Sequence, residues 1–450
     1  MQGPADVGAD WLTPVAVAPV DAVIPLPASK SMTNRALALA ALGDAPVPIV
    51  GPLQARDTEL MRAAIAALGA DVVTSDPAGT AEPGAGQPVW TITPGWRSGR
   101  THVDVGNAGT VLRFVPPLAA LAVADAEFDG DPRARQRPVA ELLAGLRQAG
   151  VEINDGGRGG LPFVVHGHGH VPGGDVTLDA SLSSQLVSGL MLAAPRYTRG
   201  LQIRHHGARV PSAQHIAMTA AMLTEAGADV EVTSTRPDDG VPDGWRIRPS
   251  RLAPGTVTIE PDVSNAAPFL AAALVTGGHL LLPGWPAAGL QPTRQIIDVL
   301  SQLGASCWHD ADGLHVEGTG KISGIDADLR DINEYAPVLT AVAALADSPS
   351  ELTGIGHMRF HETDRLAALA AEIGALGGDV TELPDGLAVR PRPLRAGAVP
   401  FDSHDDHRMV MAAAVLGLVV PGLAVRNAAT VGKTFPEFAS RWLEMLGQAP

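Results

Sequence analysis

Cations, hydroxyls and glycines cluster at several points where the sequence predicts the start of a helix. Lys30, Ser31 and Arg35 form the first such cluster, within residues 26–35. The first turn of a helix presents unpaired backbone N–H groups and a partial positive charge, which suit a phosphate or carboxylate ligand. The chemistry predicted for this segment is therefore the binding of a small anion. The alternative is a capped surface helix with solvated charges.

A glycine-rich turn and an arginine-rich loop form a second candidate anion site. Residues 106–110 read Gly-Asn-Ala-Gly-Thr, so the backbone near Asn107 and Gly109 can approach a ligand closely. The loop at residues 130–138 contains three arginines, of which Arg137 is the last. Guanidinium groups match the paired oxygens of carboxylates and phosphates. In an acidic chain this loop predicts local anion binding, although a solvated loop is the commoner outcome for such a cluster.

Carboxylates that could transfer protons lie in the second half of the chain. Glu362 and Arg365 are three residues apart at an expected helix start, where a proton donor and an anion clamp would lie side by side. The alternative is a surface salt bridge worth about 0.2–0.5 kcal/mol. His407 opens the last long apolar helix, but the chain has neither an HExxH motif nor a compact set of ligands, so we expect no metal site. Lys433 does not belong to a P-loop, because Asn427 stands where that motif requires glycine, and we interpret it as an exposed phosphate ligand.

The same helix-and-strand pattern recurs six times, which predicts how these segments are positioned. In five copies an amphipathic helix ends at a glycine and a strand follows, and the sixth copy repeats the helix and the glycine. The six glycines recur at intervals of 70–81 residues, at Gly69, Gly150, Gly227, Gly304, Gly377 and Gly447. Polar turns before new helices recur at steps of 70–80 residues, at Ser31, Asn107, Ser184, Ser264, Glu334 and Asp406. We therefore predict six α/β units of about 75 residues, each of which provides one helix N-terminus.

Composition and charge exclude several classes of protein. The 450 residues carry a formal net charge of -16, whereas nucleic-acid binding needs a cationic face, so we expect no nucleic-acid partner. The longest apolar stretch, residues 410–420, is shorter than the roughly 20 residues of a membrane helix, and the N-terminus lacks the pattern of a signal peptide. The single cysteine, Cys307, excludes an intramolecular disulfide and fits a reducing compartment. We expect a multidomain cytoplasmic protein that binds no membrane.

Six segments, in the same order along the chain, resemble the enolpyruvyl transferases, and among them the 5-enolpyruvylshikimate-3-phosphate (EPSP) synthase family. The segments are residues 26–35, 106–110, 183–185, 362–365, 406–409 and 433–436. One such segment alone carries little information, whereas six in the family's order are specific. The resemblance extends over essentially the whole chain.

The resemblance implies a fold and an activity. The fold would be α/β with two lobes, each made of three βαβαββ units, similar to an inverse α/β barrel. Residues 1–28 with 261–450 would form one lobe and residues 29–260 the other, with the active site in the cleft between them. The activity would be transfer of the enolpyruvyl group of phosphoenolpyruvate to the 5-hydroxyl of shikimate 3-phosphate, through a tetrahedral intermediate, in the shikimate pathway. No cofactor is implied, and we expect a monomer.

The resemblance also implies which residues bind the two substrates. Shikimate 3-phosphate would be held by Lys30, Ser31, Arg35, Ser183, Ser184, Gln185, Ser212, Glu334 and His361. Phosphoenolpyruvate would be held by Lys30, Asn107, Gly109, Arg137, Gln185, Arg365, Arg408 and Lys433. Because Gly109 has no side chain to intrude on phosphoenolpyruvate, sensitivity to the analogue inhibitor glyphosate is expected.

Four residues are implied for catalysis. Glu334 would be the base at the 5-hydroxyl, and Glu362 would protonate C3 of phosphoenolpyruvate. Lys30 would share the proton transfer and stabilise charge, and His407 would orient or assist. The chain departs from the family's pattern at Glu334, where aspartate is usual. It also departs where lysine, asparagine and tyrosine are common, at His361, His357 and His215.

Two other functions stay open at this point. The UDP-N-acetylglucosamine enolpyruvyl transferases are similar in fold and chemistry, but they commonly carry a cysteine in the arginine-rich loop, and residues 130–138 contain none. Cys307 lies instead in an expected strand, where a buried structural thiol is predicted. The second alternative is a two-lobed protein that binds an anion without turning it over, although such a protein would not need both Glu334 and Glu362.

Overall fold

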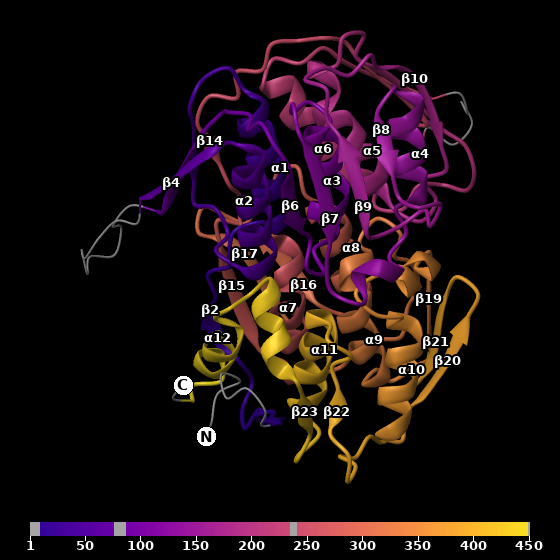
Figure 1. Cartoon of the computed structure of the whole chain (residues 1–450). Helices are drawn as coiled ribbons and strands as arrows, with labels where there is room; N and C mark the ends of the chain where they lie inside the picture. Colours follow the sequence, from indigo (N-terminus) through magenta and orange to yellow (C-terminus); the bar gives the residue numbers. More distant parts are fainter. Residues whose placement is uncertain (1–9, 76–86, 235–240, 449–450) are drawn as a thin grey trace. The chain divides into compact units, whose positions relative to one another are not determined.

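The structure, a computed structural model, describes residues 10–75, 87–234 and 241–448 (Figure 1). The chain divides into two compact units, which we call unit 1 (Met1–Pro27 with Pro261–Pro450) and unit 2 (Ala28–Glu260). The described part of each unit contains three small sheets and six α-helices.

The three sheets of unit 2 have four strands each. Their strand orders are β14-β3-β5-β4, β6-β7-β9-β8 and β10-β11-β13-β12. The strands are β3 (Val47–Val50), β4 (Asp71–Ser75), β5 (Val89–Thr93), β6 (Thr101–Asp104), β7 (Asp125–Asp129), β8 (Glu152–Asn154), β9 (Phe163–His166), β10 (Gly174–Leu178), β11 (Leu201–His205), β12 (Val230–Thr233), β13 (Gly244–Ile247) and β14 (Val257–Thr258).

The described sheets of unit 1 comprise two with four strands and one with three. Their orders are β16-β17-β15-β2, β18-β19-β21-β20 and β1-β23-β22. The strands are β1 (Trp11–Leu12), β2 (Asp21–Val23), β15 (His279–Pro283), β16 (Ser306–His309), β17 (Gly313–Glu317), β18 (Asp326–Asp328), β19 (Ser350–Thr353), β20 (Asp379–Leu383), β21 (Gly386–Arg390), β22 (Phe401–Asp402) and β23 (Ala424–Arg426).

One pairing pattern is common to the four-stranded sheets. In the sheet β6-β7-β9-β8, for example, β6 and β7 are parallel, whereas β9 is antiparallel to both β7 and β8. Parallel neighbours need a helical crossover, while antiparallel neighbours can be joined by a short connection. A helix follows each of the first two strands, which gives the order βαβαββ. The two-lobed α/β fold predicted from the repeat and the resemblance is confirmed, and the described part of the sheet β1-β23-β22 in unit 1 has one strand fewer than the others.

Three sheets take one strand from a distant part of the chain. In unit 1, β1 pairs antiparallel with β23, so that Trp11 lies opposite Val425. In unit 2, β14 pairs in parallel with β3, so that Val257 lies opposite Ile49. In unit 1, β2 pairs in parallel with β15, so that Asp21 lies opposite His279. In each of these sheets, one strand therefore completes a sheet whose other strands lie far from it in the sequence.

Six central helices are buried along nearly their whole length. They are α1 (Lys30–Leu42), α3 (Gly109–Ala119) and α5 (Ser184–Ala193) in unit 2, and α7 (Ala267–Thr276), α9 (Ala336–Ala344) and α11 (His407–Gly417) in unit 1. A helix that is apolar on all sides is one that protein surrounds. These helices begin at the six polar turns of the sequence, directly or through the 3-10 turns η3 (Val263–Ala266) and η4 (Asn333–Tyr335). The prediction that each turn provides a helix N-terminus is confirmed.

Six outer helices are amphipathic and end at the repeated glycines. They are α2 (Arg56–Leu68), α4 (Ala140–Gln148), α6 (Ala213–Glu225), α8 (Thr293–Gln302), α10 (Arg365–Ala375) and α12 (Phe438–Met445). In α2, for example, Met61, Ile65 and Leu68 share the buried face. The six glycines after these helices have φ between 66° and 122°, a conformation that favours glycine. The predicted helix ends are confirmed.

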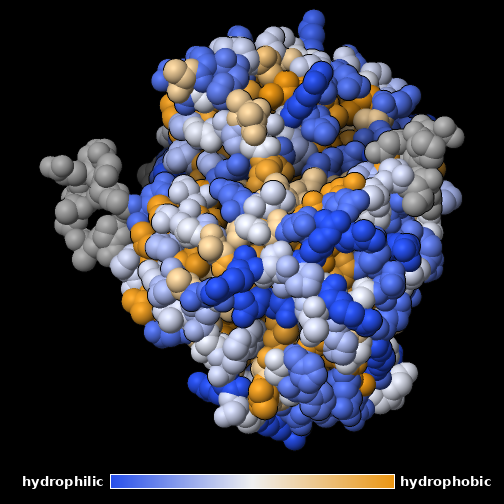
Figure 2. Space-filling view, turned by 90° about the horizontal axis from the view of Figure 1, so that it is seen from above, coloured by the Kyte–Doolittle hydropathy of each residue, from blue (hydrophilic) through white to orange (hydrophobic). Residues whose placement is uncertain are grey.

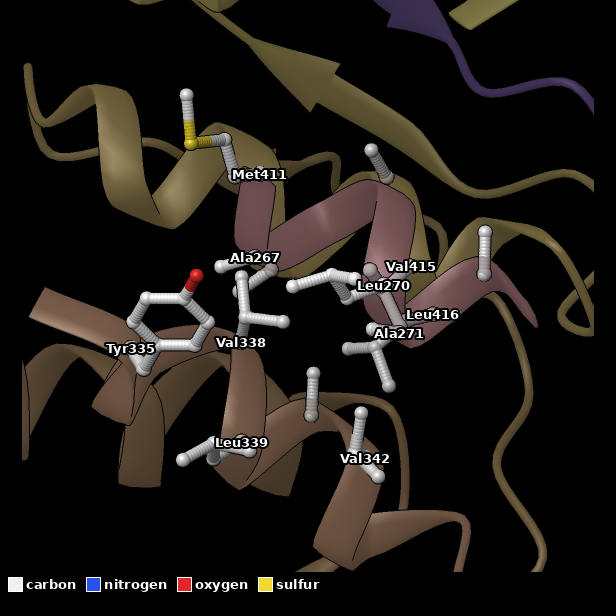
Figure 3. Close-up of a cluster of buried hydrophobic side chains, with 14 of the residues drawn as sticks. Ala267, Leu270, Ala271, Tyr335, Val338, Leu339, Val342, Met411, Val415 and Leu416 are labelled. Carbon is white, nitrogen blue, oxygen red and sulfur yellow. The ribbon is translucent and has the colours of Figure 1, made fainter. Parts of the chain in front are cut away.

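The central helices of unit 1 pack against one another through apolar side chains. Figure 3 shows Leu270 of α7, Val338 of α9 and Val415 of α11 in one buried cluster. Burial of each such side chain stabilises the fold by about 1.5–3 kcal/mol. The hydroxyl of Tyr335 donates to the backbone oxygen of Val263 at 2.5 Å, which ties the turn before α9 to the turn before α7. The core therefore fixes the polar turns above it.

The face of the molecule seen in Figure 2 is mainly polar. Figure 2 shows hydrophilic side chains over most of one face, with hydrophobic ones between them in separate groups. Within the described ranges, no helix combines the length and the apolar character that crossing a bilayer requires.

Candidate functional site

Arg408, the second residue of α11, joins the starts of the three central helices of unit 1. Its Nη1 donates to the backbone oxygen of Ser264 at 2.5 Å and its Nη2 donates to the Ser264 hydroxyl at 2.8 Å, in the turn before α7. Its Nε lies 3.2 Å from Oε2 of Glu334, in the turn before α9. One buried guanidinium group therefore contacts all three helix starts.

Arg365 forms the centre of a cluster of charged groups beside these turns. Its Nε and Nη2 donate to the two oxygens of Asp406 at 2.7 and 3.2 Å. Its Nη1 lies 3.3 Å from Oε2 of Glu334, and its Nη2 lies 3.1 Å from Oε2 of Glu362. Burial by itself lowers the pKa of Arg365, but the three carboxylates outweigh burial and raise it. Arg365 is therefore a permanent cation in a fixed orientation.

Glu362 bridges two cations. Its Oε1 accepts a hydrogen bond from Nζ of Lys433 at 2.9 Å, and its Oε2 accepts the bond from Arg365. Lys433 is the last residue of the 3-10 segment η6 (Ala428–Lys433) and is 5% exposed, so the predicted exposed position of this lysine is wrong. The chain buries the lysine because the Glu362 carboxylate compensates its charge. Glu362 and Arg365 lie side by side here, as their spacing predicts, and their roles as proton donor and anion clamp stay predictions.

Glu334 is ionised in this setting. Burial raises the pKa of Glu334, but the nearby guanidinium groups of Arg365 and Arg408 outweigh it and hold the pKa well below its usual range. Its side chain is 31% exposed. An ionised carboxylate at a helix start can accept a proton from a ligand hydroxyl.

Two histidines lie next to this cluster. Nδ1 of His361 lies 3.1 Å from Nη1 of Arg365, and because arginine only donates, the hydrogen of a neutral His361 ring must be on Nε2. Burial, with Arg365 as the next cause, holds the pKa of His361 well below its usual range. Burial also lowers the pKa of His357 to about 4. Both rings are therefore neutral near pH 7, and a neutral His361 can donate from Nε2.

Asp406 is the residue of this cluster that the sequence-based list of site residues omits. It is fully buried, caps α11 by accepting from the backbone N–H of Arg408 at 2.8 Å, and orients Arg365. An aspartate before an apolar helix is a recognisable cap signal, but its second role depends on a partner 41 residues away. His407 is 1% exposed, and its Nδ1 lies 3.5 Å from Asp406.

The turn before α11 has an unusual backbone. His404 and Asp405 have φ of 50° and 56°, in the left-handed region that non-glycine residues seldom adopt. Asn427, also left-handed, donates from its side chain to Asp405, and the Thr430 hydroxyl donates to the backbone oxygen of Asp405 at 3.1 Å. Such conformations persist where surrounding contacts determine them, often at functional sites. These contacts attach the turn that carries Asp406 to the segment that ends at Lys433.

In unit 2, the expected ligand Lys30 is the first residue of α1. Ser29 caps this helix, and Nζ of Lys30 lies 3.4 Å from Oδ2 of Asp57. Asp57, in the first turn of α2, is 2% exposed. The sequence reasoning missed Asp57, whose only local signal is its acidic side chain at a helix start.

Gly109 lies against three polar side chains of unit 2. A methyl group at this position would lie 2.8 Å from the guanidinium groups of Arg113 and Arg137 and 2.9 Å from Oε1 of Gln185. Arg113 donates to Gln185 at 3.0 Å, and Arg137 donates to the backbone oxygen of Asn107 at 2.9 Å. The starts of α3 and α5 therefore adjoin, and only glycine leaves room at residue 109.

The arginine-rich loop contributes one buried side chain. Arg137 is 7% exposed, whereas Arg135 forms an exposed pair with Asp129 at 2.7 Å and Arg133 bonds to Gln136. Two of the three arginines thus follow the solvated alternative.

Arg35 is buried within unit 2. It is 1% exposed and donates to the Thr219 hydroxyl at 2.7 Å and to the backbone oxygens of Ser31 and His215 at 2.9 Å. Its guanidinium carbon lies 5.1 Å from the centre of the Phe114 ring. Burial lowers the pKa of Arg35 to about 9. These contacts hold α1 against the start of α6.

The serines of the predicted site lie at helix starts. Ser183 caps α5 by accepting from the N–H of Gln185 at 3.3 Å, and Ser184 is the first residue of that helix. Ser212 precedes α6 and has φ of 50°. The Ser183 and Ser184 hydroxyls thus lie at a helix start, as the sequence predicts.

The predicted residues therefore form separate groups. Unit 1 brings together Glu334, His361, Glu362, Arg365, Arg408 and Lys433. Unit 2 brings together Asn107, Gly109, Arg137 and Gln185, while Lys30 pairs with Asp57.

The six-sheet fold is similar to the folds of solved enolpyruvyl transferases. The structure is similar to that of the enolpyruvyl transferase NikO from Streptomyces tendae, with a TM-score of 0.70, 16% identity and 97% of each chain covered. It is also similar to two structures of EPSP synthase from Acinetobacter baumannii, both 23% identical. Their TM-scores are 0.75 and 0.72, with 98% and 95% of this chain and 99% and 96% of theirs covered.

The family is established by the sequence. The family model for EPSP synthase (3-phosphoshikimate 1-carboxyvinyltransferase) matches residues 15–442, and the chain belongs to this family. It is a transferase that moves the enolpyruvyl group of phosphoenolpyruvate to shikimate 3-phosphate. The two alternatives, a UDP-N-acetylglucosamine enolpyruvyl transferase and a non-catalytic anion-binding protein, are less well supported. Cys307 is partly buried in β16, where burial raises the pKa of its thiol to about 11 and so disfavours the reactive thiolate.

Proposed function

We propose that the residue groups of both units act on one pair of substrates, with the unit 1 cluster performing the proton transfers. The observation that carries this proposal is the joining of two carboxylates, Glu334 and Glu362, by the three cations Arg365, Arg408 and Lys433. The reaction needs a base, an acid and compensation for two anionic substrates. This cluster supplies all three.

Phosphoenolpyruvate would be held by cations from both groups. Arg365, Arg408 and Lys433 would contact it from unit 1. Unit 2 would contribute Lys30, Asn107, Gly109, Arg137 and Gln185. Arginine forks suit its carboxylate and phosphate, and the guanidinium group of Arg137 lies against Gly109.

Shikimate 3-phosphate would be held mainly by helix starts and hydroxyls. The proposed contacts are Lys30, Ser31, Arg35, Ser183, Ser184, Gln185, Ser212, Glu334 and His361. Because Arg35 is engaged with Thr219 and the α6 start, we propose that it acts chiefly by positioning Ser31. The neutral His361 would donate from Nε2 to a substrate oxygen.

The proposed mechanism proceeds in two steps. The 5-hydroxyl oxygen attacks C2 of phosphoenolpyruvate, Glu334 accepts the hydroxyl proton, and Glu362 protonates C3 to give the tetrahedral adduct. The bond between C2 and the phosphate oxygen then breaks, and phosphate leaves with the hydroxyl proton that Glu334 had accepted. C3 returns a proton to the Glu362 carboxylate, which restores the double bond. Lys30 stabilises charge and shares proton transfer. His407 is buried next to Asp406, so its proposed contribution is to orient the α11 start.

Phosphate release tests the proposed function. The protein is mixed with phosphoenolpyruvate and shikimate 3-phosphate, and in parallel with phosphoenolpyruvate and UDP-N-acetylglucosamine. We expect release in the first mixture alone. Release in neither mixture would contradict the enzymatic function, and release in the second alone would favour the UDP-sugar alternative. The monomeric state and the cytoplasmic location stay predictions.

A further inference from the structure

The cations proposed to hold phosphoenolpyruvate in unit 1 already contact the two proposed catalytic carboxylates. Arg365 and Arg408 approach one oxygen of Glu334, at 3.3 and 3.2 Å. Arg365 and Lys433 contact the two oxygens of Glu362, at 3.1 and 2.9 Å. Two carboxylates thus face three cations. Phosphoenolpyruvate likewise carries two anionic groups, a carboxylate and a phosphate.

Other contacts fix the guanidinium groups in place. Asp406 accepts two hydrogen bonds from Arg365 while it caps α11, and Ser264 accepts two from Arg408. Asp406 is fully buried, so it cannot move away without disrupting the helix start. Glu334 differs because its side chain is 31% exposed and belongs to a short 3-10 turn. It can turn toward solvent while the arginines stay in position.

We propose that Glu334 and Glu362 occupy the anion positions of the phosphoenolpyruvate site in the free protein and release their cations when the substrate binds. The inference rests on the proposed function, in which these cations hold phosphoenolpyruvate. The N–H group of Arg365 that donates to Glu334 at 3.3 Å is not available to a substrate oxygen, since each N–H donates along one direction. Side-chain carboxylate and substrate therefore compete for the same donors.

The exchange links substrate binding to the proton transfer. Burial raises the pKa of Glu334, and Arg365 and Arg408 lower it. When the substrate takes the place of Glu334 beside these fixed guanidinium groups, their hold on Glu334 weakens and its proton affinity increases. Glu334 thus becomes a stronger base when phosphoenolpyruvate is present to react.

Phosphoenolpyruvate affinity in charge-neutralised variants tests the proposal. Calorimetric titration uses the whole protein without shikimate 3-phosphate, so that no turnover occurs. In Glu334→Gln we expect binding about fivefold tighter, the factor that corresponds to loss of a partly exposed ion pair. Asp406→Asn also removes a negative charge beside Arg365, but Asp406 is the residue that orients this guanidinium group. We expect this variant to bind phosphoenolpyruvate about tenfold more weakly. The matched control, Asp379→Asn, removes the partner of Arg392 at 2.8 Å elsewhere in unit 1 and should leave affinity unchanged.

Each outcome decides the question. Unchanged or weaker binding in Glu334→Gln would overturn the proposal, and so would equal tightening in Glu334→Gln and Asp406→Asn, which would indicate net charge alone. If thermal melting shows that Asp406→Asn is unfolded, Glu362→Gln takes its place and must also tighten binding while Asp379→Asn does not. Lys433→Ala separates the two proposals. If Lys433→Ala binds phosphoenolpyruvate more weakly but Glu334→Gln does not bind it more tightly, the proposed substrate site is supported and the proposed competition is contradicted. If no form of the protein binds phosphoenolpyruvate, both the site and the competition are contradicted.

Discussion

Replacement of Glu362 by glutamine tests the proposed general acid. Glutamine has nearly the same shape but carries neither the charge nor the transferable proton. Loss of a general acid slows turnover by at least about 100-fold, or about 2.7 kcal/mol of barrier. Stranding a buried cation costs about 3–5 kcal/mol. In Glu362→Gln, Arg365 still pairs with Asp406, and the amide oxygen of the new side chain still accepts a hydrogen bond from Lys433. We therefore expect the unfolding free energy to fall by only about 1–2 kcal/mol.

Three measurements distinguish lost chemistry from lost structure. Phosphate release gives kcat, which should fall, and the KM for shikimate 3-phosphate, which should stay near that of the unmodified protein. In heavy water, entry of deuterium at C3 of phosphoenolpyruvate should slow in parallel with phosphate release. The matched control is Glu372→Gln, which removes a partly buried glutamate of α10 that accepts from His404 at 2.9 Å. Its kcat should stay within about twofold, as for substitutions away from the reacting groups.

Two results would refute the reasoning. An unimpaired kcat in folded Glu362→Gln would remove this residue from the mechanism. Normal entry of deuterium at C3 together with slow phosphate release would assign Glu362 to a step other than protonation.

Three further predictions concern binding, orientation and pH. Lys433→Ala should raise the KM for phosphoenolpyruvate by at least about tenfold with little change for shikimate 3-phosphate, as expected for a charge-assisted contact; equal KM values would show that Lys433 does not hold this substrate. Asp406→Asn should lower the unfolding free energy by about 3 kcal/mol in urea denaturation, because it weakens a buried ion pair, and a loss below about 1 kcal/mol would contradict that role. The pKa of His357 is about 4 when folded and about 6.5 when unfolded, so its stabilising contribution is complete above pH 6.5 and is lost as the pH falls toward 4. His357→Asn should therefore lose about 1–2 kcal/mol less than the unmodified protein between pH 7 and 5, measured by urea denaturation, and equal losses would contradict the burial of a neutral ring.

The sequence by itself determined the repeat and the helix boundaries. Glycines such as Gly69 and Gly377 end the outer helices because a left-handed residue is needed there, which is a local property of the chain. Serine and aspartate side chains at Ser29, Ser183 and Asp406 cap the central helices through bonds to residues two or three positions away. Such short-range effects can be recognised in a linear sequence. The resemblance then supplied the chemistry expected at these helix starts.

Only the tertiary structure decided which charged groups meet. Arg365 contacts Asp406, 41 residues away, and Lys433 contacts Glu362, 71 residues away. The sequence predicts an exposed Lys433, but packing buries it because a carboxylate from another segment compensates its charge. The motif places Arg35 where a residue that binds substrate is expected. In the structure, however, most of its N–H donors bond to α5 and α6 and so hold these helices against α1. Electrostatic pairing depends on distances in space, and these follow from the packing of the central helices rather than from spacing along the chain.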